Sequence, residues 1–310
     1  MTEEILDKKR AISVIKNLRK SIQKYFKENN LTYAIFGKSE GLDSSVIAGL
    51  LSSLKGVKPV GVIMPCESKP DAERIAKIVL DYYKIPYIRV DLTEEYKTLV
   101  SFYNSEKGLN DQLKSIMENY GDSFDENFAL RKSRCFGNIK VRLRMITLYY
   151  IAQVTGGIVI STDNLSEFWT GFWTLNGDVG DLAPIQNIWK GLEEKTIAEV
   201  LKVPEESLNA VPTDGLEIIP NGTDEDQLGL PYPELDRVII SLLRNKFDGS
   251  ERNNKKVSLL SKQLSKKLGY SEDKIRHVAY QMINTHYKRN WPKVFSRKET
   301  GLLDLKDIKI

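Results

Sequence analysis

The stretch IFGKSEGLDSSVIAGLL, residues 35–51, joins two apolar runs through a loop of glycine, serine, lysine and two acids. A strand that ends in glycine and serine and then opens a helix can turn its backbone N–H groups toward an anion. Ser39, Ser44 and Ser45 add hydroxyl donors to this loop. Two common phosphate loops are excluded, because the Walker pattern needs glycine where Thr32 stands and G-x-G-x-x-G is absent. The alternative is a polar turn that only caps the following helix.

Short apolar runs alternate with helical patterns along the first half of the chain. The expected strands are 33–37, 58–65, 86–92 and 156–162, and the expected helices are 4–28, 43–56, 70–83 and 137–154, with a polar helical stretch over 94–133. This alternation predicts an α/β fold, a doubly wound parallel sheet with helices on both faces. Ligands of such sheets bind beyond the carboxyl ends of the strands, here at the loops that begin at Gly37 and Ser161. The charged segment 248–258 predicts a mobile surface loop.

Composition and charge exclude several functional classes. Of the 310 residues 41% are hydrophobic, and 46 basic against 42 acidic residues give a net charge of +4, which is too balanced to indicate nucleic acid binding and suits an anionic small ligand. The sparse cysteines and histidines exclude a disulfide framework and a zinc site: Cys66, Cys135, His277 and His286. A signal peptide and an apolar run of about 18 residues are both lacking. We therefore expect a cytoplasmic protein without a membrane span.

Several sequence blocks resemble those of a known family. Residues 39–44 resemble the S-G-G-x-D-S loop of the ATP pyrophosphatases, with Glu40 in place of the first glycine. STDNLSEFWTGFWTLNGDVGDLAPI (161–185) resembles the G-T-x-N-x-x-E…T-G-F-x-T-x-x-G-D segment of NAD synthetases. Further blocks resemble that family in the same order: GNIKVRLRM (137–145), VPTDGL (211–216), GTDEDQLGLPYPELD (222–236) and YKRNWP (287–292). The chain is therefore identified as similar to the NAD synthetases.

This resemblance implies an adenine nucleotide alpha hydrolase-like fold, as one domain over residues 1–310 that forms a homodimer. It also implies two chemical steps. The nicotinate carboxylate of deamido-NAD attacks the α-phosphate of ATP and releases pyrophosphate, and ammonia then converts the acyl-adenylate into the amide of NAD and AMP.

The resemblance also assigns residues to roles. Asp43 and Glu167 are implied as ligands of Mg²⁺, a hard cation that takes carboxylate and phosphate oxygens, and with Lys190 as the catalytic residues. The implied ATP-binding residues are Gly37, Ser39, Gly41, Asp43, Ser44, Ser45, Thr162, Lys190 and Thr213. The implied deamido-NAD-binding residues are Asn138, Arg142, Asp181 and Lys288, the last of them through phosphate.

Each of these residues also has a plainer interpretation. Asp43 could serve only as a helix N-cap, and Glu167 could pair with a lysine. Arg142 and Arg144 could lie on a solvated helix face, Arg144 more so than Arg142. Aromatic residues of the central block are expected in core or dimer packing rather than in stacking on a ligand: Trp169, Phe172 and Trp173.

The chain departs from the family pattern in three places. Glu40 either points outward and pairs with Lys38, so that ATP binds, or it weakens the site through repulsion of phosphate, which costs on the order of 1 kcal/mol or more. In TLNGDVGDL (174–182), two residues differ from the common Lys-Tyr and one is missing before Asp181. Residues 100–133 exceed what a minimal member needs and are expected to form a lid or an interface. These departures leave open a related ATP pyrophosphatase that adenylates another substrate, or a nucleotide-binding paralogue with impaired catalysis.

The source of ammonia is the last expectation. Residues 1–30 predict one amphipathic helix and no amide-hydrolysing domain. We therefore expect free ammonia as the nitrogen donor, unless a separate glutaminase supplies it.

Overall fold

The structure is a computed structural model that describes residues 5–105, 109–122, 126–213, 222–297 and 299–301, without the side chains of 126–130. It divides into two compact units, of which the first comprises Met1–Glu167 and Trp173–Arg237, and the second Phe168–Phe172 and Val238–Ile310. The prediction of a single domain over the whole chain stays a prediction.

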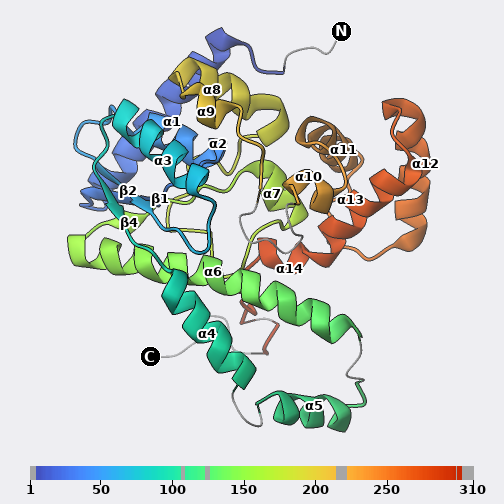
Figure 1. Cartoon of the computed structure of the whole chain (residues 1–310). Coiled ribbons are helices and arrows are strands. Elements are labelled where there is room, and N and C mark those ends of the chain that lie inside the picture. The colour runs from blue at the N-terminus through green and yellow to red at the C-terminus, as the bar shows by residue number, and fades with distance from the viewer. Residues whose placement is uncertain (1–4, 106–108, 123–125, 214–221, 298, 302–310) are drawn as a thin grey trace, which may run out of the picture. The chain divides into compact units, whose positions relative to one another are not determined.

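A parallel four-stranded sheet lies at the centre of the first unit (Figure 1). Its strands follow the order β3-β2-β1-β4, with bounds Tyr87–Arg89, Lys58–Ile63, Tyr33–Gly37 and Ile158–Val159. Each described pairing is parallel, for example Ile35 with Val60 and with Val159. Because β1 and β4 are neighbours, the loops that follow these two strands start from the same edge of the sheet.

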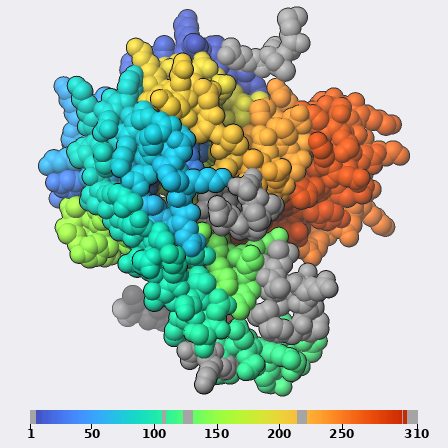
Figure 2. Space-filling view, in the orientation of Figure 1, coloured from blue at the N-terminus to red at the C-terminus, as the bar shows by residue number. Residues whose placement is uncertain are grey.

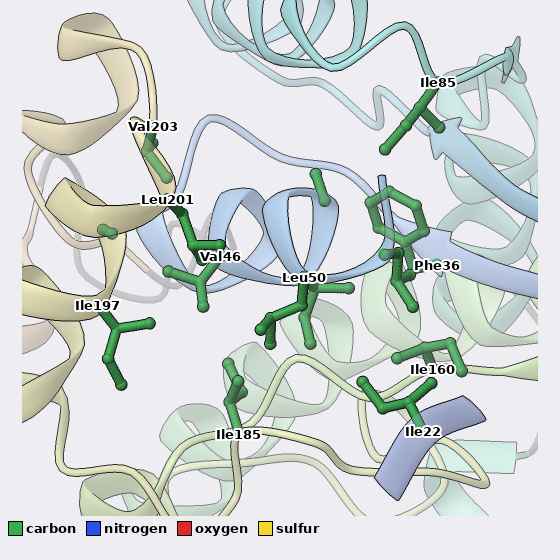
Figure 3. Packing of buried hydrophobic residues seen from close by; sticks show 14 of the residues in the cluster. Ile22, Phe36, Val46, Leu50, Ile85, Ile160, Ile185, Ile197, Leu201 and Val203 are labelled. Atoms are coloured by element: carbon green, nitrogen blue, oxygen red, sulfur yellow. The ribbon is translucent and has the colours of Figure 1, made fainter. Parts of the chain in front are cut away.

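Helices cover one face of this sheet through the side chains of alternate residues of β1. Ala34 and Phe36 pack in a buried cluster with α1 (Lys8–Glu28), α2 (Leu42–Leu51), α3 (Pro70–Tyr82) and α8 (Lys195–Leu201). Figure 3 shows Phe36 in this cluster with Leu50 of α2 and Ile197 of α8. The continuous apolar sequence of α2 fits this position, since every residue from Ser44 to Leu51 is buried.

The opposite face is covered mainly by α6 (Glu126–Thr155). Ile35 and Val62 point to this side and pack with Met145, Leu148 and Ala152 of α6. A strand whose successive side chains are buried on both faces reads as a continuous apolar run, which is why YAIFG looked like a buried strand. The predicted doubly wound parallel sheet with helices on both faces is confirmed.

The helices between residues 93 and 155 differ in their bounds from the predicted ones. The stretch 94–133 contains α4 (Thr93–Ser105), α5 (Leu109–Asn119) and the first residues of α6, which begins at Glu126 instead of 137. Neither α4 nor α5 buries a residue among those described, and Figure 2 shows both at the surface of the first unit. A role of 100–133 as a lid or interface stays a prediction.

The other regular elements of the described residues are helices. In the first unit lie the π-helix η1 (Lys190–Glu194), α9 (Glu205–Leu208) and α10 (Asp224–Leu228), while α7 (Leu165–Thr170) and α11 (Tyr232–Arg244) each run from the first unit into the second. The second unit also holds α12 (Asn254–Leu268), α13 (Glu272–Asn284) and α14 (His286–Arg289). The loop predicted over 248–258 was therefore wrong from Asn254 onward, where Asn253 caps α12. Among the described helices none is long and apolar enough to cross a membrane.

Candidate active site

The loop between β1 and α2 is closed by its own serine hydroxyls. Gly41 is the N-cap residue of α2, and its N–H donates to Ser39 Oγ at 3.1 Å. Ser44 Oγ and Ser45 Oγ donate back to the Gly41 carbonyl at 3.1 and 2.9 Å. This arrangement places Gly37, where β1 ends, one short loop away from the N-terminus of α2. A helix N-terminus with nearby hydroxyl donors is suited to bind phosphate.

Lys38 does not pair with Glu40 as expected. Its side chain is buried beneath the loop, where Nζ donates to the Ser39 carbonyl, to Ser44 Oγ (3.1 Å) and to Ser45 Oγ (2.8 Å). Glu40 is half-buried, and the described residues include no ion pair between the two. The physical reason is that an ammonium group has three donors, and the loop offers three acceptors below it.

Asp43, Glu167 and Lys190 converge at the carboxyl edge of the sheet. Lys190 Nζ lies 2.7 Å from Asp43 Oδ2 and 3.5 Å from Glu167 Oε1. Asn164 joins the two carboxylates, since its Nδ2 donates to Asp43 Oδ1 at 2.7 Å and its N–H donates to Glu167 Oε2 at 3.3 Å. The three predicted catalytic residues therefore face one another, although they are far apart in the sequence.

Burial and mutual attraction set the charges of this cluster. Burial is the largest single influence on Lys190 and would lower its pKa, but the combined attraction of Asp43, Tyr232, Glu167 and Glu194 raises this pKa well above its usual value. Burial raises the pKa of Glu167 well above the usual value, and Lys190 opposes this shift. The Lys190 ammonium is also 4.8 Å from the centre of the Tyr232 ring. The cluster therefore holds a permanent cation against at least one carboxylate.

Glu194 is a member of this cluster that the sequence did not reveal. It is fully buried, and neither of its carboxyl oxygens has a hydrogen-bond partner in the described part of the chain. Burial raises its pKa well above the usual value, and Asp43, Lys190 and Glu167 are its charged neighbours. Glu194 ends the π-helix that begins at Lys190. Such π-turns are rare and often occur at functional sites.

Asp236 and Ser166 hold the backbone of Lys190 in place, and the sequence did not reveal this either. Ser166 Oγ donates to Asp236 Oδ1 at 2.5 Å and accepts the N–H of Lys190 at 3.1 Å. The N–H of Gly191 donates to Asp236 Oδ2 at 2.8 Å. A side chain added at Gly191 would collide with the backbone of Tyr232, since its Cβ would lie 2.3 Å from the Tyr232 carbonyl carbon. These contacts fix the direction in which the lysine enters the cluster.

Replacement of Asp236 by asparagine is expected to change how stability depends on pH. Burial raises the pKa of Asp236 to about 7 from 3.8, so the folded state holds this proton in a range where the unfolded state has lost it. The free energy of unfolding of the wild type should therefore fall as pH rises from about 4 to about 7, with a contribution from this group on the order of a few kcal/mol. Asp236→Asn should lose that contribution in urea unfolding measured across the same range.

The matched control is Asp81→Asn, which alters an exposed aspartate. It should leave the pH dependence of unfolding as it is in the wild type. An equal pH slope for Asp236→Asn and the wild type would show that Asp236 ionises normally in the folded protein.

Two of the residues predicted to bind deamido-NAD contact the altered segment 174–182. Asn138 Oδ1 accepts the Thr174 hydroxyl at 2.8 Å, and Arg142 Nε donates to the Leu175 carbonyl at 3.3 Å. Asp181 accepts the Tyr149 hydroxyl at 2.8 Å and the Val159 N–H at 2.9 Å. These contacts anchor the segment to α6 and β4, and the binding roles of Asn138, Arg142 and Asp181 stay predictions.

Thr162, Thr213 and Lys288 are the remaining predicted site residues. Thr162 follows β4 and is half-buried, and Thr213 is exposed. Lys288 belongs to the second unit, where its Nζ donates to the Gly171 carbonyl at 2.7 Å. Their roles in binding stay predictions.

The oxygen ligands of this cluster fit a magnesium ion that also binds phosphate and water better than they fit a metal bound by protein ligands alone. Asp43 and Glu167 supply hard carboxylate oxygens, and a cationic group, the Lys190 ammonium, already lies against both. Among the described residues no three His, Cys, Asp or Glu side chains are grouped to hold a metal. Mg²⁺ is commonly bound by one or two carboxylates together with phosphate oxygens and water, so a small carboxylate set is sufficient.

A parallel α/β sheet with a glycine- and serine-rich loop, a helix N-terminus and a carboxylate–lysine cluster at its carboxyl edge is the arrangement found in nucleotide-binding α/β proteins. The model of one family, NAD synthase, matches residues 14–292. The chain belongs to the NAD synthase family. The NH(3)-dependent NAD(+) synthetase of Finegoldia magna is 37% identical over 226 residues, which are 73% of this chain and 83% of that protein. That of Pyrococcus furiosus is 32% identical over 270 residues, 86% of this chain and 90% of that protein.

Solved structures share the fold. The NMN synthetase from Francisella tularensis superposes with a TM-score of 0.68 at 22% identity, over 92% of this chain and 98% of the other. An NH3-dependent NAD synthetase from Campylobacter jejuni, in complex with the nitrate ion, gives a TM-score of 0.65 at 18% identity, over 92% and 99%. At such low identity these likenesses establish the fold alone.

Proposed function

We propose that this chain is an ammonia-dependent NAD synthetase, which forms NAD from deamido-NAD, ATP and ammonia. The observation that carries the proposal is the convergence of Asp43, Glu167 and Lys190 beside the N-terminus of α2. Membership of the NAD synthase family, with relatives named NH(3)-dependent NAD(+) synthetase, supports it.

The chemistry requires a carboxylate to become an acyl donor. A carboxylate is a poor electrophile, and attack of its oxygen on the α-phosphorus of ATP breaks the bond to the bridging oxygen and releases pyrophosphate. Ammonia then attacks the carbonyl carbon of the acyl-adenylate, loses a proton and expels AMP. One oxygen of the original carboxylate therefore leaves on the phosphorus of AMP. Catalysis of this kind depends on position and on charge stabilisation, because negative charge grows on the leaving pyrophosphate.

The loop between β1 and α2 and the Asp43–Glu167–Lys190 cluster have different tasks in this reaction. The phosphates of ATP bind to Ser39, Ser44 and the first N–H groups of α2. The other ATP-binding members of this loop are Gly37, Gly41 and Ser45. Lys190, held by Ser166 and Asp236, directs a fixed positive charge at the phosphates, with Thr162 and Thr213 as further phosphate contacts.

Asp43 and Glu167 are the residues that would hold Mg²⁺. When bound there, the ion would neutralise charge on the phosphate oxygens. The proposed deamido-NAD contacts remain Asn138, Arg142, Asp181 and Lys288. Asn138 and Arg142 are positioned by their bonds to Thr174 and Leu175.

The test of this function is the stoichiometry of the products. Purified protein with deamido-NAD, ATP, Mg²⁺ and ammonium should give NAD, AMP and pyrophosphate in equal amounts. Glutamine in place of ammonium should give no NAD unless a separate glutaminase is added. ADP as the nucleotide product, or no NAD from well-folded protein, would contradict the proposal. Pyrophosphate release with a different carboxylate substrate would favour a related adenylating enzyme instead.

We further propose that the chain forms a homodimer through an apolar stripe on α6, formed by Ile146, Tyr150 and Val154. These side chains are four residues apart and therefore lie on one helix face, and they are 66%, 69% and 69% exposed. Exposed apolar stripes of this kind are typical of protein–protein contact sites.

Tyr150→Glu is expected to convert a dimer into a monomer in light scattering coupled to gel filtration. A buried carboxylate without a partner costs more than such an interface can offset. Leu259→Glu, an exposed apolar residue of α12 outside this stripe, should leave the dimer intact. A wild type that is monomeric at micromolar concentration, or a dimeric Tyr150→Glu protein, would contradict this use of α6.

The reaction is proposed to occur in the cytoplasm. In support, Cys66 and Cys135 are both free thiols, as a reducing compartment would keep them.

A further inference from the structure

The Lys38 ammonium is buried, and none of the reaction steps proposed above involves it. Its side chain lies under the loop of the nucleotide site, and the residue is only 3% exposed. Its backbone N–H donates to the Val62 carbonyl of β2 at 2.9 Å, so the residue is fixed to the edge of the sheet. All three N–H donors of the ammonium have acceptors in the loop, which are the Ser39 carbonyl and the hydroxyl oxygens of Ser44 and Ser45.

These contacts affect the hydroxyls that close the loop onto the Gly41 carbonyl, beside Ser39, whose exposed hydroxyl would meet a phosphate. An oxygen that accepts a bond from a cation becomes a better donor through its own hydrogen, because linked hydrogen bonds polarise one another. Ser44 Oγ also lies 3.2 Å from Ser39 Oγ, so the polarised hydroxyl is next to the exposed one. Ser45 Oγ is paired in addition with Ser207 Oγ of α9 at 2.6 Å. The lysine therefore acts on the whole loop from below.

The carboxylate of Glu40 gives this cation a second role. Glu40 and Asp43 are the charged groups that act on Lys38, and both attract it. The neighbouring helix α9 presents only the uncharged Ser207 to the loop interior. Arg144 of α6 also interacts electrostatically with Glu40. A loop that carries a carboxylate would repel triphosphate, and a buried ammonium a few residues away offsets that repulsion.

We propose that Lys38 is a positioning residue of the nucleotide site, which shapes the Ser39–Ser45 loop from beneath and supplies the positive charge that offsets Glu40 when ATP binds. This inference rests on the proposed function in that ATP is its ligand. It differs from that function because it concerns nucleotide binding and makes no use of the later transfer to ammonia.

The charge of Lys38 is sensitive to pH. Burial lowers the pKa of Lys38 to about 7, while Glu40 and then Asp43 act to raise it. The ammonium is therefore charged below neutral pH and is lost above it, unless a bound polyanion retains the proton. ATP affinity should fall as pH rises from about 6 to about 8.5, because binding at the higher pH must first protonate the lysine.

The test measures ATP binding by calorimetry with Mg²⁺ present, at about pH 6 and about pH 8.5, in the full chain. Lys38→Met should bind ATP about tenfold more weakly at the lower pH, because it removes the charged hydrogen bonds that hold the loop and the charge that offsets Glu40. This variant should also lose the part of the difference in ATP affinity between the two pH values that comes from the lysine. Lys16→Met, at an exposed position of α1, should behave like the wild type and shows any pH effect of ATP itself.

A second variant keeps the test sharp if Lys38→Met does not fold. Glu40→Gly removes the carboxylate that holds the proton on Lys38, so the midpoint of the pH dependence should move to lower pH. Lys38→Met with wild-type affinity and an unchanged pH profile would overturn the inference, as would Glu40→Gly with an unmoved midpoint. These measurements do not depend on NAD formation. If ATP affinity did not depend on Lys38 while the protein still formed NAD, only the proposed role of Lys38 would be contradicted.

Discussion

Lys190→Met is expected to lower kcat/KM for NAD formation by about 10²- to 10³-fold. Removal of one preorganised charge that stabilises a transition state typically costs about that factor. The lysine is the group that contacts both Asp43 and Glu167, so its loss also leaves two carboxylates side by side without their common cation. The measurement is steady-state NAD formation at saturating Mg²⁺, with thermal unfolding as a check of the fold.

Lys195→Met is the matched control, because it removes an exposed lysine one turn further along the chain. It should keep kcat/KM close to that of the wild type. If Lys190→Met also kept wild-type activity, the cluster would be a structural ion-pair network and the active site would have to lie elsewhere.

Asp43→Asn is expected to have an effect of similar size, with a different signature. The amide can still accept a hydrogen bond from Asn164, but it carries no charge to hold Mg²⁺ or to pair with Lys190. Activity should fall by at least about 10²-fold, and the Mg²⁺ concentration for half-maximal activity should rise, because Mg²⁺ strongly prefers carboxylate ligands. A Mn²⁺ binding titration in the presence of ATP provides a readout that does not depend on turnover.

The control for this variant is Asp71→Asn, which removes an aspartate from the first turn of α3 as Asp43 lies in the first turn of α2. Loss of a general helix-dipole effect there should cost only about 0.3–1 kcal/mol of stability and no activity. Equal, small effects of the two substitutions would mean that Asp43 serves only its helix.

The sheet and the position of the candidate site could be predicted because local sequence patterns indicate both. Apolar runs such as 33–37 marked buried strands, and the glycines and serines after β1 marked the loop that we propose binds phosphate. The resemblance then brought together residues such as Asp43, Glu167 and Lys190, which lie far apart in the chain and converge in the structure.

The supporting residues could not be predicted because their roles depend on direction in space. Lys38 looked like a surface partner for Glu40, yet its side chain turns inward to three acceptors. Glu194 enters the cluster through a π-turn, a geometry that no spacing rule signals. Asp236 is one of several acids in its segment, and only its contacts to Ser166 and Gly191 distinguish it.

The most direct test of the proposed chemistry follows the oxygen atoms. Deamido-NAD labelled with ¹⁸O in the nicotinate carboxylate is turned over with ATP, Mg²⁺ and ammonium, and the products are analysed by mass spectrometry. Attack of the carboxylate on the α-phosphorus predicts one labelled oxygen in AMP and none in pyrophosphate. Label in pyrophosphate or in inorganic phosphate, or unlabelled AMP alongside newly formed NAD, would contradict adenylation of the carboxylate at this site.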